Sequence, residues 1–279
     1  MSAPRGPSRR TIAALLGLVL AAAAIAVAAA ATKKSSVTVG ENASGTATAT
    51  CAKGQRATLG GFATTLAEPG PYVHPRALVL SGRSVRAGGV NEQGPGLGGG
   101  PGKVTAVAYC GTRRFLGKAG AFNTAPPGQR AAATAKCPKG MYVAAGGFRS
   151  DIAPSGTGAL VYVDGLERVG AGKWRASAIN DGSAPGKVTA LAYCFPGSQA
   201  LTTVTKSVVI SPGKTGSVTA RCPKGKAVVF GGVRSQHYGS GGGELQLSSM
   251  MRAGNRGWNV RALKFANIIG RLTSVAYCG

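Results

Sequence analysis

The sequence predicts an all-β fold built from three disulfide-bonded repeats, and three observations support this prediction. Six cysteines belong to three copies of one pattern that recurs about every 85 residues, which is typical of a repeat architecture. Within each copy, short apolar or alternating runs are separated by Gly, Pro and Ser, as in β-strands joined by turns. After the first 31 residues, no stretch shows the apolar period of a helix.

Each copy of the pattern opens and closes with a cysteine. The opening segments are Cys51-Ala52-Lys53-Gly54, Cys137-Pro138-Lys139-Gly140 and Cys222-Pro223-Lys224-Gly225. A glycine pair follows each of them, at Gly60-Gly61, Gly146-Gly147 and Gly231-Gly232. The closing segments share the ending Ala-Tyr-Cys and are Gly102–Cys110, Gly186–Cys194 and Gly270–Cys278.

The second copy shows the expected strands most clearly. In chain order they are Ala131–Cys137, Met141–Ala145, Leu160–Asp164, Trp174–Ile179 and Val188–Cys194, with one more strand over Leu201–Ile210 before the third copy. The Cys-Pro-Lys-Gly segment suits a type I turn with Pro at i+1 and Gly at i+3. We expect the glycine pairs to mark β-bulges or close backbone contacts.

An alanine stands two positions before every cysteine. These alanines are Ala49, Ala108, Ala135, Ala192, Ala220 and Ala276. Because residues i and i−2 of a strand share a face, each cysteine is expected on a face of small residues, where two layers can approach closely. The opposite face of the closing strand carries bulkier residues, such as Thr105, Val107 and Tyr109, and is expected to fill a core.

The first copy departs from the other two. It has Ala52 in place of the proline, and Ser84-Val85-Arg86 where the others have Trp174 and Trp258. Its segment Gly94–Gly102 is rich in glycine and formally matches G-x-G-x-x-G. It neither follows a clear strand nor opens a helix, so the match does not indicate a dinucleotide site.

The N-terminal residues resemble an export signal. Arg5, Arg9 and Arg10 precede an apolar run, and Ala29-Ala30-Ala31 fits a cleavage site. Residues 1–31 are therefore expected to be a signal peptide, or a retained membrane anchor, since about 20 apolar residues suffice to span a bilayer. Residues 32–279 are expected to form one domain of three repeats, 36–111, 115–195 and 203–279.

An even number of cysteines behind such a segment predicts disulfides in an oxidising compartment, and hence a secreted or cell-surface protein. Two symmetric pairings are open. The first, which we favour because it stays within each repeat's own strands, is Cys51–Cys110, Cys137–Cys194 and Cys222–Cys278. The second joins neighbouring copies and the chain's two ends, as Cys110–Cys137, Cys194–Cys222 and Cys51–Cys278.

The Cys-Pro-x-Gly openings and the closing strands ending in Tyr-Cys resemble two groups of proteins. They look like uncharacterised secreted proteins of high-GC Gram-positive bacteria with paired-cysteine repeats. More distantly, they are similar to the vitelline membrane outer layer protein I family. That resemblance implies a β-prism-like domain of three repeats around a pseudo-threefold axis; the alternative is three tandem small β-modules. The acidic segment that this family has before its last strand is absent here, so no functional residue is carried over.

Positive charge is the strongest functional signal in the sequence. The formal net charge is +25, with only 8 acidic residues, and such a field attracts anionic surfaces and polymers. Basic residues recur at two positions of each copy, in the opening turn and before the closing strand. These candidate binding residues are Lys53, Lys139, Lys224, Lys103, Lys187 and Arg271.

Residues for catalysis or metal binding are sparse. His74 and His237 are the only histidines, and neither lies near an acid in the pattern of a catalytic pair. No His/Cys cluster has metal-ligand spacing, so neither a metal nor a cofactor is expected. Trp174 and Trp258 occupy matching positions, where they either stack on a glycan or, as we favour, fill a β core.

These features predict an exported, non-catalytic protein of the cell envelope. Its expected partner is an anionic cell-wall polymer, an anionic membrane surface or a glycan, bound through the basic turns. Nucleic acid is expected to bind only non-specifically, and no protein partner is indicated. Two alternatives are a lectin-like carbohydrate-binding module and a secreted hydrolase of wall polymers.

Overall fold

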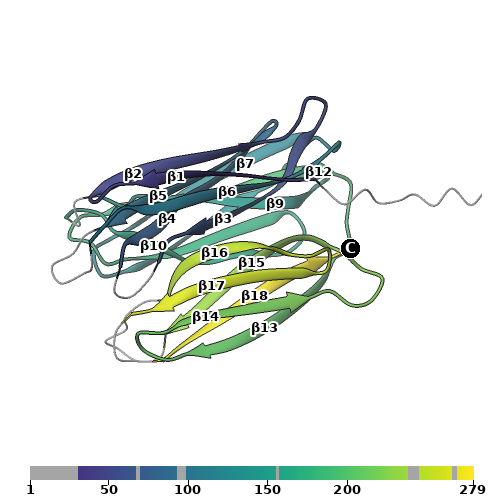
Figure 1. Cartoon of the computed structure of the whole chain (residues 1–279). Helices are drawn as coiled ribbons and strands as arrows, with labels where there is room; N and C mark the ends of the chain where they lie inside the picture. The colour runs from purple at the N-terminus through teal and green to yellow at the C-terminus, as the bar shows by residue number, and fades with distance from the viewer. Residues whose placement is uncertain (1–30, 67–69, 93–98, 155–156, 238–244, 266–268) are drawn as a thin grey trace, which may run out of the picture.

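The computed structural model describes residues 31–66, 70–92, 99–154, 157–237, 245–265 and 269–279, which form 18 strands and no helix (Figure 1). The first copy supplies β1 (Ala31–Val39), β2 (Ala43–Thr50), β3 (Arg56–Thr64), β4 (Tyr72–Ser81), β5 (Ser84–Glu92) and β6 (Gly102–Gly111). The second supplies β7 (Gly117–Ala125), β8 (Arg130–Lys136), β9 (Met141–Ser150), β10 (Val161–Arg168), β11 (Lys173–Asn180) and β12 (Gly186–Pro196). The third supplies β13 (Thr202–Ile210), β14 (Thr215–Arg221), β15 (Val228–His237), β16 (Leu245–Ala253), β17 (Gly257–Lys264) and β18 (Gly270–Cys278).

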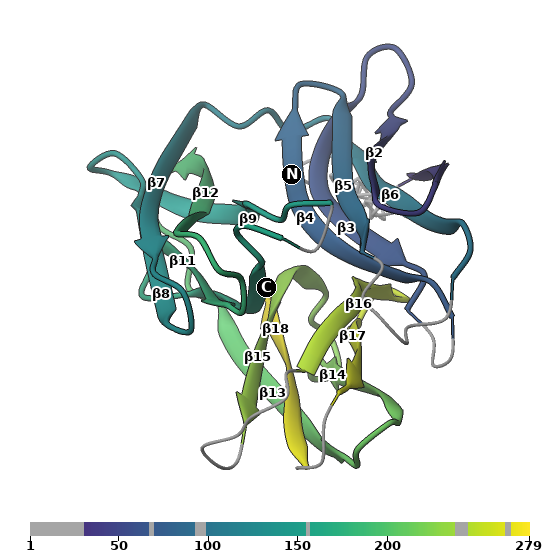
Figure 2. The ribbon, with the colours of Figure 1, turned by 90° about the vertical axis from the view of Figure 1, so that its left-hand side faces the viewer.

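The strands form three six-stranded antiparallel sheets, and every sheet is shared by two copies. Sheet A is ordered β1-β6-β3-β16-β17-β14, sheet B β2-β5-β4-β9-β12-β7 and sheet C β13-β18-β15-β10-β11-β8. The first, sixth and third strands of a copy thus lie in one sheet, and its second, fifth and fourth strands lie in the next. Figure 2 shows the three copies as lobes around a common centre. The all-β, pseudo-threefold prediction is confirmed, and the alternative of three tandem modules is wrong because no copy keeps a sheet to itself.

Each lobe is a two-layer sandwich closed by one disulfide. The bonds are Cys51–Cys110, Cys137–Cys194 and Cys222–Cys278, with Cα–Cα distances of 5.6, 5.7 and 5.6 Å. The pairing within copies, which we favoured, is therefore the one observed. Each bond joins the two half-sheets of its lobe, and loops of 56 to 59 residues give about 4 kcal/mol each in the chain-entropy treatment.

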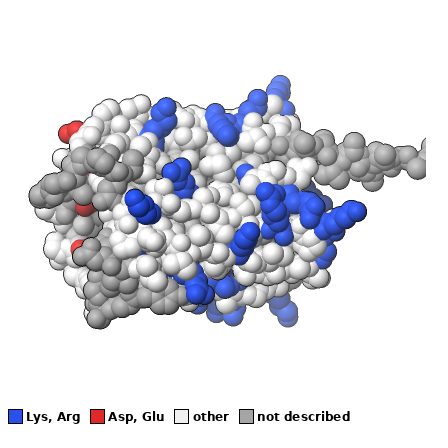
Figure 3. Space-filling model, turned by 60° about the horizontal axis from the view of Figure 1, so that its bottom comes forward, with Lys and Arg blue, Asp and Glu red and all other residues white. Residues whose placement is uncertain are grey.

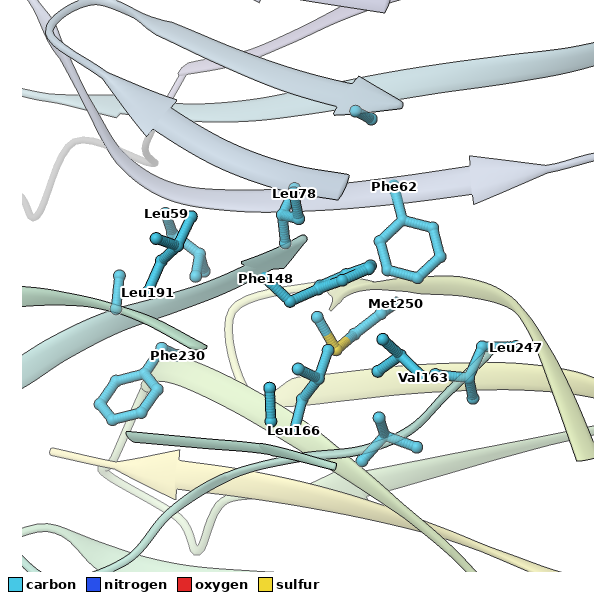
Figure 4. Packing of buried hydrophobic residues seen from close by; sticks show 14 of the residues in the cluster. Leu59, Phe62, Leu78, Phe148, Val163, Leu166, Leu191, Phe230, Leu247 and Met250 are labelled. Carbon is cyan, nitrogen blue, oxygen red and sulfur yellow. The ribbon is translucent and has the colours of Figure 1, made fainter. Parts of the chain in front are cut away.

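The lobes meet in one continuous hydrophobic core. Near the centre, Phe62 and Phe148 pack edge to face with ring centroids 6.0 Å apart, beside Leu78, Leu166 and Met250 (Figure 4). All five side chains are less than 2 % exposed. Since these residues come from all three copies, the centre of the core forms only when the copies assemble.

The glycine pairs are sites of close contact. A Cβ on Gly146 would lie 2.0 Å from the Trp174 ring, and one on Gly231 would lie 2.2 Å from Trp258. A Cβ on Gly147 would lie 2.2 Å from the Leu78 carbonyl oxygen of the neighbouring copy. Of the two expectations, close contact is the one realised. The register shifts fall earlier in these strands, as at Val143 to Ala145.

The first copy solves the same packing with smaller groups. Val85 pairs with Ala49 as Trp174 pairs with Ala135, so Val85 occupies the tryptophan position. A Cβ on Gly60 would lie 3.0 Å or more from its neighbours, which are methyl groups of Leu80, Val85 and Leu78. The departure of Ser84-Val85-Arg86 from the pattern is therefore a change of core volume that leaves the strand in place.

The joints between copies are short. In sheet B only Ala77–Arg149 and Leu78–Phe148 pair across the joint, and sheets A and C likewise have two pairs each. Beyond these pairs a tyrosine hydroxyl accepts a backbone N–H of the next copy. The three bonds are Leu80 N–H to Tyr193, Arg168 N–H to Tyr277 and Arg252 N–H to Tyr109, each 2.7 Å long.

These tyrosines belong to the bulky face that the sequence was expected to place in a core. They are buried, with Tyr193 and Tyr277 each 2 % exposed, but they lie at the joints between copies. The small face, with Ala192 and Cys194, lines the inside of the lobe, as expected. The predicted export segment lies outside the described residues, apart from Ala31, where β1 begins.

We predict that Gly146→Ala destabilises the protein by about 1–3 kcal/mol or more, because the new methyl group overlaps the Trp174 ring. Introducing Trp174→Val, which copies the residue at position 85, should reduce the cost of Gly146→Ala. Denaturant unfolding of the four proteins of this cycle measures the coupling. Gly120→Ala is the matched control, since its Cβ would lie 3.6 Å from the nearest atom. A cost of Gly146→Ala that is the same with and without Trp174→Val would contradict the packing argument.

We predict that Tyr193→Phe lowers the free energy of unfolding by about 1–3 kcal/mol, because it leaves the buried Leu80 N–H without an acceptor. Burial raises the pKa of Tyr193 to about 12, so its phenol stays protonated in the folded chain past the ordinary value of 10. A raised pKa stabilises the fold below pH 10, and this contribution disappears as the pH rises from 10 towards 12. The difference in stability between wild type and Tyr193→Phe should therefore shrink over that interval; a constant difference would contradict the assignment.

Candidate functional site

The structure separates the six predicted basic residues into two sets at opposite ends of the lobes. Lys53 lies in the turn beside Cys51, which is bonded to Cys110 at the end of β6, whereas Lys103 lies at the start of β6. At about 3.3 Å per residue of strand, these positions are on the order of 20 Å apart. The same holds in the other two copies, and all six side chains are exposed. They do not form one surface.

The opening turn differs in type from the prediction. The closing hydrogen bond runs from Met141 N–H to the Pro138 carbonyl, so the turn spans residues 138–141. Gly140 then stands at i+2 with φ of 79°, which suits a type II turn and excludes type I. Lys139 occupies i+1, at the tip. The equivalent glycines, Gly54 and Gly225, both have φ of 84°, so all three lysines project from the same corner.

We call the end that carries the three bridges the disulfide end. Its loops are 51–55, 82–83, 112–116, 137–140, 169–172, 197–201, 222–227 and 254–256. Their exposed cations are Lys53, Arg83, Arg113, Arg114, Lys139, Lys224, Lys226 and Arg256. None of these loops contains Asp or Glu. The loop acids that the structure describes, Glu41, Asp151 and Asp181, lie at the opposite end, and Figure 3 shows this polarity on one face.

Two arginines of the disulfide end also hold its turns in place. The Arg83 guanidinium donates two hydrogen bonds to the Cys51 carbonyl, at 3.1 and 2.8 Å. Arg256 does the same to the Cys222 carbonyl, at 3.0 and 2.7 Å. These carbonyls end the second strand of their copies, and the guanidinium satisfies them without any acidic partner. The fold therefore stabilises this basic end with backbone oxygens, and no carboxylate neutralises it.

Trp174 and Trp258, the candidate glycan contacts, both have fully buried side chains. Each indole covers the first glycine of a pair inside its lobe, and Trp174 Nε1 donates to the Gly147 carbonyl at 3.0 Å. A sugar in solvent has no access to either ring. The glycan-contact interpretation of these two residues is therefore wrong, and the core interpretation, which we favoured, holds.

Two surface pockets lie on the outer faces of sheets B and C, at the joints between copies. Pocket B, of about 360 Å³, is lined by Thr46, Arg76, Ala77, Val79, Ser81, Arg86, Gly88, Lys118, Arg149, Ser150 and Asp151. Pocket C, of about 350 Å³, is lined by Arg130, Asp164, Gly165, Glu167, Arg175, Ser177, Thr205, Ser207, Arg234, Ser235, Gln236, Arg271 and Thr273. Apart from Arg271, which was a predicted candidate, the sequence alone did not single out these arginines, because strands distant in the chain bring them together.

A buried polar cluster lies where the three copies meet at the other end. His74 packs on the Tyr162 ring, with centroids 4.8 Å apart, and the Tyr162 hydroxyl donates to Glu92. Nε2 of His74 is 3.7 Å from Glu92 Oε2, too far for a hydrogen bond. Burial lowers the pKa of His74 to about 3 and raises that of Glu92, so the histidine is neutral at pH 7. Spacing in the sequence gave no sign of this pairing.

This cluster offers little room for a substrate. The cavity beside His74 and Tyr162 measures about 10 Å³, roughly the minimum for one water molecule. The side chain of His237, the other histidine, lies outside the described part of the structure. Within the described residues, no three His, Cys, Asp or Glu side chains gather as metal ligands.

No protein-family model matches the chain, and no curated protein is similar to it in sequence. Over the described ranges, no helix has the length and apolar character needed to cross a membrane.

We predict that wild-type protein loses stability as the pH falls from 6.5 towards 3, because the unfolded chain protonates His74 while the folded chain does not. The raised pKa of Glu92 acts in the opposite direction, favouring the folded chain as that carboxyl takes up its proton. His74→Gln copies Gln246, the residue at the corresponding position of the third copy. As the pH falls across this window, the unfolding free energy of wild type minus that of the variant should decrease. A difference independent of pH would contradict the neutral, buried histidine.

Proposed function

We propose that this is an exported, non-catalytic protein that docks on an anionic polymer of the cell envelope through its disulfide end. The observation that carries the proposal is the absence of acids from every loop of that end, while cations extend from all three copies. Three disulfides per chain are typical of proteins in oxidising, extracellular compartments.

The distribution of charge favours docking by one end over general attraction. A cation flanked by acids loses much of its field within a Debye length of about 8 Å at physiological salt. At the disulfide end no acid of the loops screens the cations, so their fields add. A flexible polyanion can contact the turns of several copies at once, and each further contact then becomes intramolecular.

The opening turns also give their own lysine residues a fixed backbone. Each lysine sits at the tip of a hydrogen-bonded turn anchored by a disulfide, so little backbone freedom is lost on binding. The two tryptophans on which the lectin-like alternative depended are buried in the core. Binding is therefore expected to be electrostatic, with long cationic side chains meeting phosphate or carboxylate groups.

The test compares two triple variants with the same loss of charge. Lys53→Gln/Lys139→Gln/Lys224→Gln removes the turn lysines, and Lys103→Gln/Lys187→Gln/Arg271→Gln removes the matching cations at the opposite end. We expect the first variant to elute at clearly lower salt than wild type from immobilised poly(glycerol phosphate). Its slope of log affinity against log salt should drop by up to about 3, one for each lost contact. The second variant should stay close to wild type.

Several results would count against the docking proposal. Equal losses in the two triple variants would show general charge attraction without a docking end. Wild-type retention that is absent at low salt, or that persists unchanged in high salt, would exclude an electrostatic mechanism. Thermal unfolding of each variant serves as the folding control, and the exposed positions make large changes in stability unexpected.

A further inference from the structure

The pseudo-threefold arrangement places three equivalent sites on the outer faces of the sheets, one at each joint. Equivalence follows from the strand register. Arg234 pairs with Gly165 across the joint of sheet C, Arg149 pairs with Ala77 in sheet B, and Ala63 pairs with Ser249 in sheet A. Differences among the three sites therefore reflect their side chains, because the backbone frame is the same.

In sheet C the chain fills this site with a carboxylate of its own. Glu167 pairs in register with Arg175, and its two carboxylate oxygens accept from Arg175 and Arg234 on either side. Nearby, Asp164 Oδ2 lies 3.1 Å from Arg130 Nη2, and Asp164 Oδ1 accepts from the Ser177 hydroxyl at 2.7 Å. Pocket C is thus lined by four arginines, and its two acids form ion pairs with three of them.

Pocket B has the same pair of arginines without counterparts of Asp164 and Glu167, and Asp151 is the one acid of its lining. Arg86 stands opposite Val79 as Arg175 stands opposite Glu167, and Arg149 holds the position of Arg234. Valine therefore replaces the bridging glutamate between the two arginines. Arg76 lies at the register shift of β4, and Asp164 lies at the equivalent register shift of β10. The first copy therefore has a cation where the second copy has an acid.

Lys118 increases the charge of pocket B further. It reaches in from β7, where it pairs with Tyr193 and lies 5.8 Å from the Tyr193 ring centroid. Arg149 and Arg86 line the same pocket, and the pKa of Lys118 is lowered, first by partial burial and then by these two arginines. Among the described residues, none of the four cations of pocket B forms an ion pair with a carboxylate.

The third site shows that the fold does not require this charge. In sheet A, Ala63 replaces the joint arginine, and Asn259 pairs with Met251 where the other sheets have Arg86 and Arg175. That site lacks the arginine pair, although it has one cation, Arg261, which pairs with Ser249 as Ser177 pairs with Gly165. Clustered cations in pocket B are thus a property of these side chains, and their mutual repulsion costs electrostatic energy that no described ion pair offsets.

We propose that pocket B binds a phosphoryl group, seated between Arg86 and Arg149 where pocket C holds the carboxylate of Glu167, with Arg76 and Lys118 as further donors. A phosphate monoester carries a charge of about −1.5 to −2 at pH 7 and three strong acceptor oxygens. This matches the four cations and one acid that line pocket B better than a carboxylate does. Arginine pairs bind phosphate through two parallel N–H donors each, and a volume of about 360 Å³ leaves room for a small ester.

The one acid of the pocket does not occupy the seat. Asp151 Oδ2 accepts the Lys187 N–H at 2.9 Å, which ties that carboxylate to the start of β12. The pocket also lies apart from the opening turns, since its lining includes none of the three turn lysines. The inference therefore stands independently of docking by the disulfide end.

The test restores the missing carboxylate. Val79→Glu copies Glu167 and should bridge Arg86 and Arg149 from within, which would displace the ligand. Met251→Glu is the matched control, because it adds the same charge at the equivalent position of sheet A. Isothermal titration calorimetry at low salt measures the binding of inorganic phosphate and of glycerol 1-phosphate. We expect both to bind wild type and Met251→Glu with the same affinity. Val79→Glu should bind more than about tenfold more weakly.

A second variant keeps the proposal testable if Val79→Glu fails to fold. Arg86→Gln/Arg149→Gln changes two exposed side chains and should likewise lose phosphate binding, whereas the triple turn-lysine variant should keep it. If the small probes fail but poly(glycerol phosphate) binding falls in both pocket variants, the phosphoryl group comes from a polymer and the proposal is supported. Phosphate affinity unchanged by Val79→Glu and by Arg86→Gln/Arg149→Gln would overturn the pocket, and would leave the docking end untouched.

Discussion

The hydrogen bond from a backbone N–H to a tyrosine hydroxyl of the next copy is the interaction on which the rest of the structure depends. Each sheet passes from one copy to the next through only two residue pairs, and the strands then separate. A buried N–H without a partner costs about 1–3 kcal/mol, so separation inside the molecule needs a substitute acceptor. The tyrosine supplies it and covers the joint with its ring. Without it, strands would have to stay paired and the lobes could not diverge.

That divergence explains both the core and the pockets. On the inner side, the lobes converge on a shared centre that holds Phe62, Phe148 and Met250, so no copy has a complete core by itself. On the outer side, each divided sheet leaves a site at the joint, and two of these are pockets of about 350 and 360 Å³. The glycine pairs make the arrangement possible, because Gly147 lets the Leu78 carbonyl of the neighbouring copy approach its backbone.

Local features could be predicted from the sequence because they depend on neighbours in the chain. The alanine before each cysteine identified the inner face of the closing strand. The first copy was seen to lack a tryptophan in the region of Ser84-Val85-Arg86, and the strand register then identified Val85 as the residue at that position. The shared sheets could not be predicted, since pairs such as Leu78 with Phe148 join different copies and leave no local pattern. The tyrosines are part of the core, as expected, but for the same reason their position at the joints between copies could not be predicted. Arg86 and Arg149 were not singled out, because they are distinguished only by Val79, which pairs with Arg86 where the second copy has a glutamate.

The contrast between positions 79 and 167 shows how such a scaffold can change its binding without changing its fold. Both side chains are nearly buried and both stand between two arginines in the same register. Glutamate there accepts from both arginines, so each guanidinium already has a carboxylate partner within the protein. Valine is smaller and uncharged, so the arginines are left with solvent or a ligand as their partner. Since the backbone frame is fixed by the tyrosine bonds and the disulfides, a few side chains distinguish the structural ion pairs of one joint from the proposed binding site of the other.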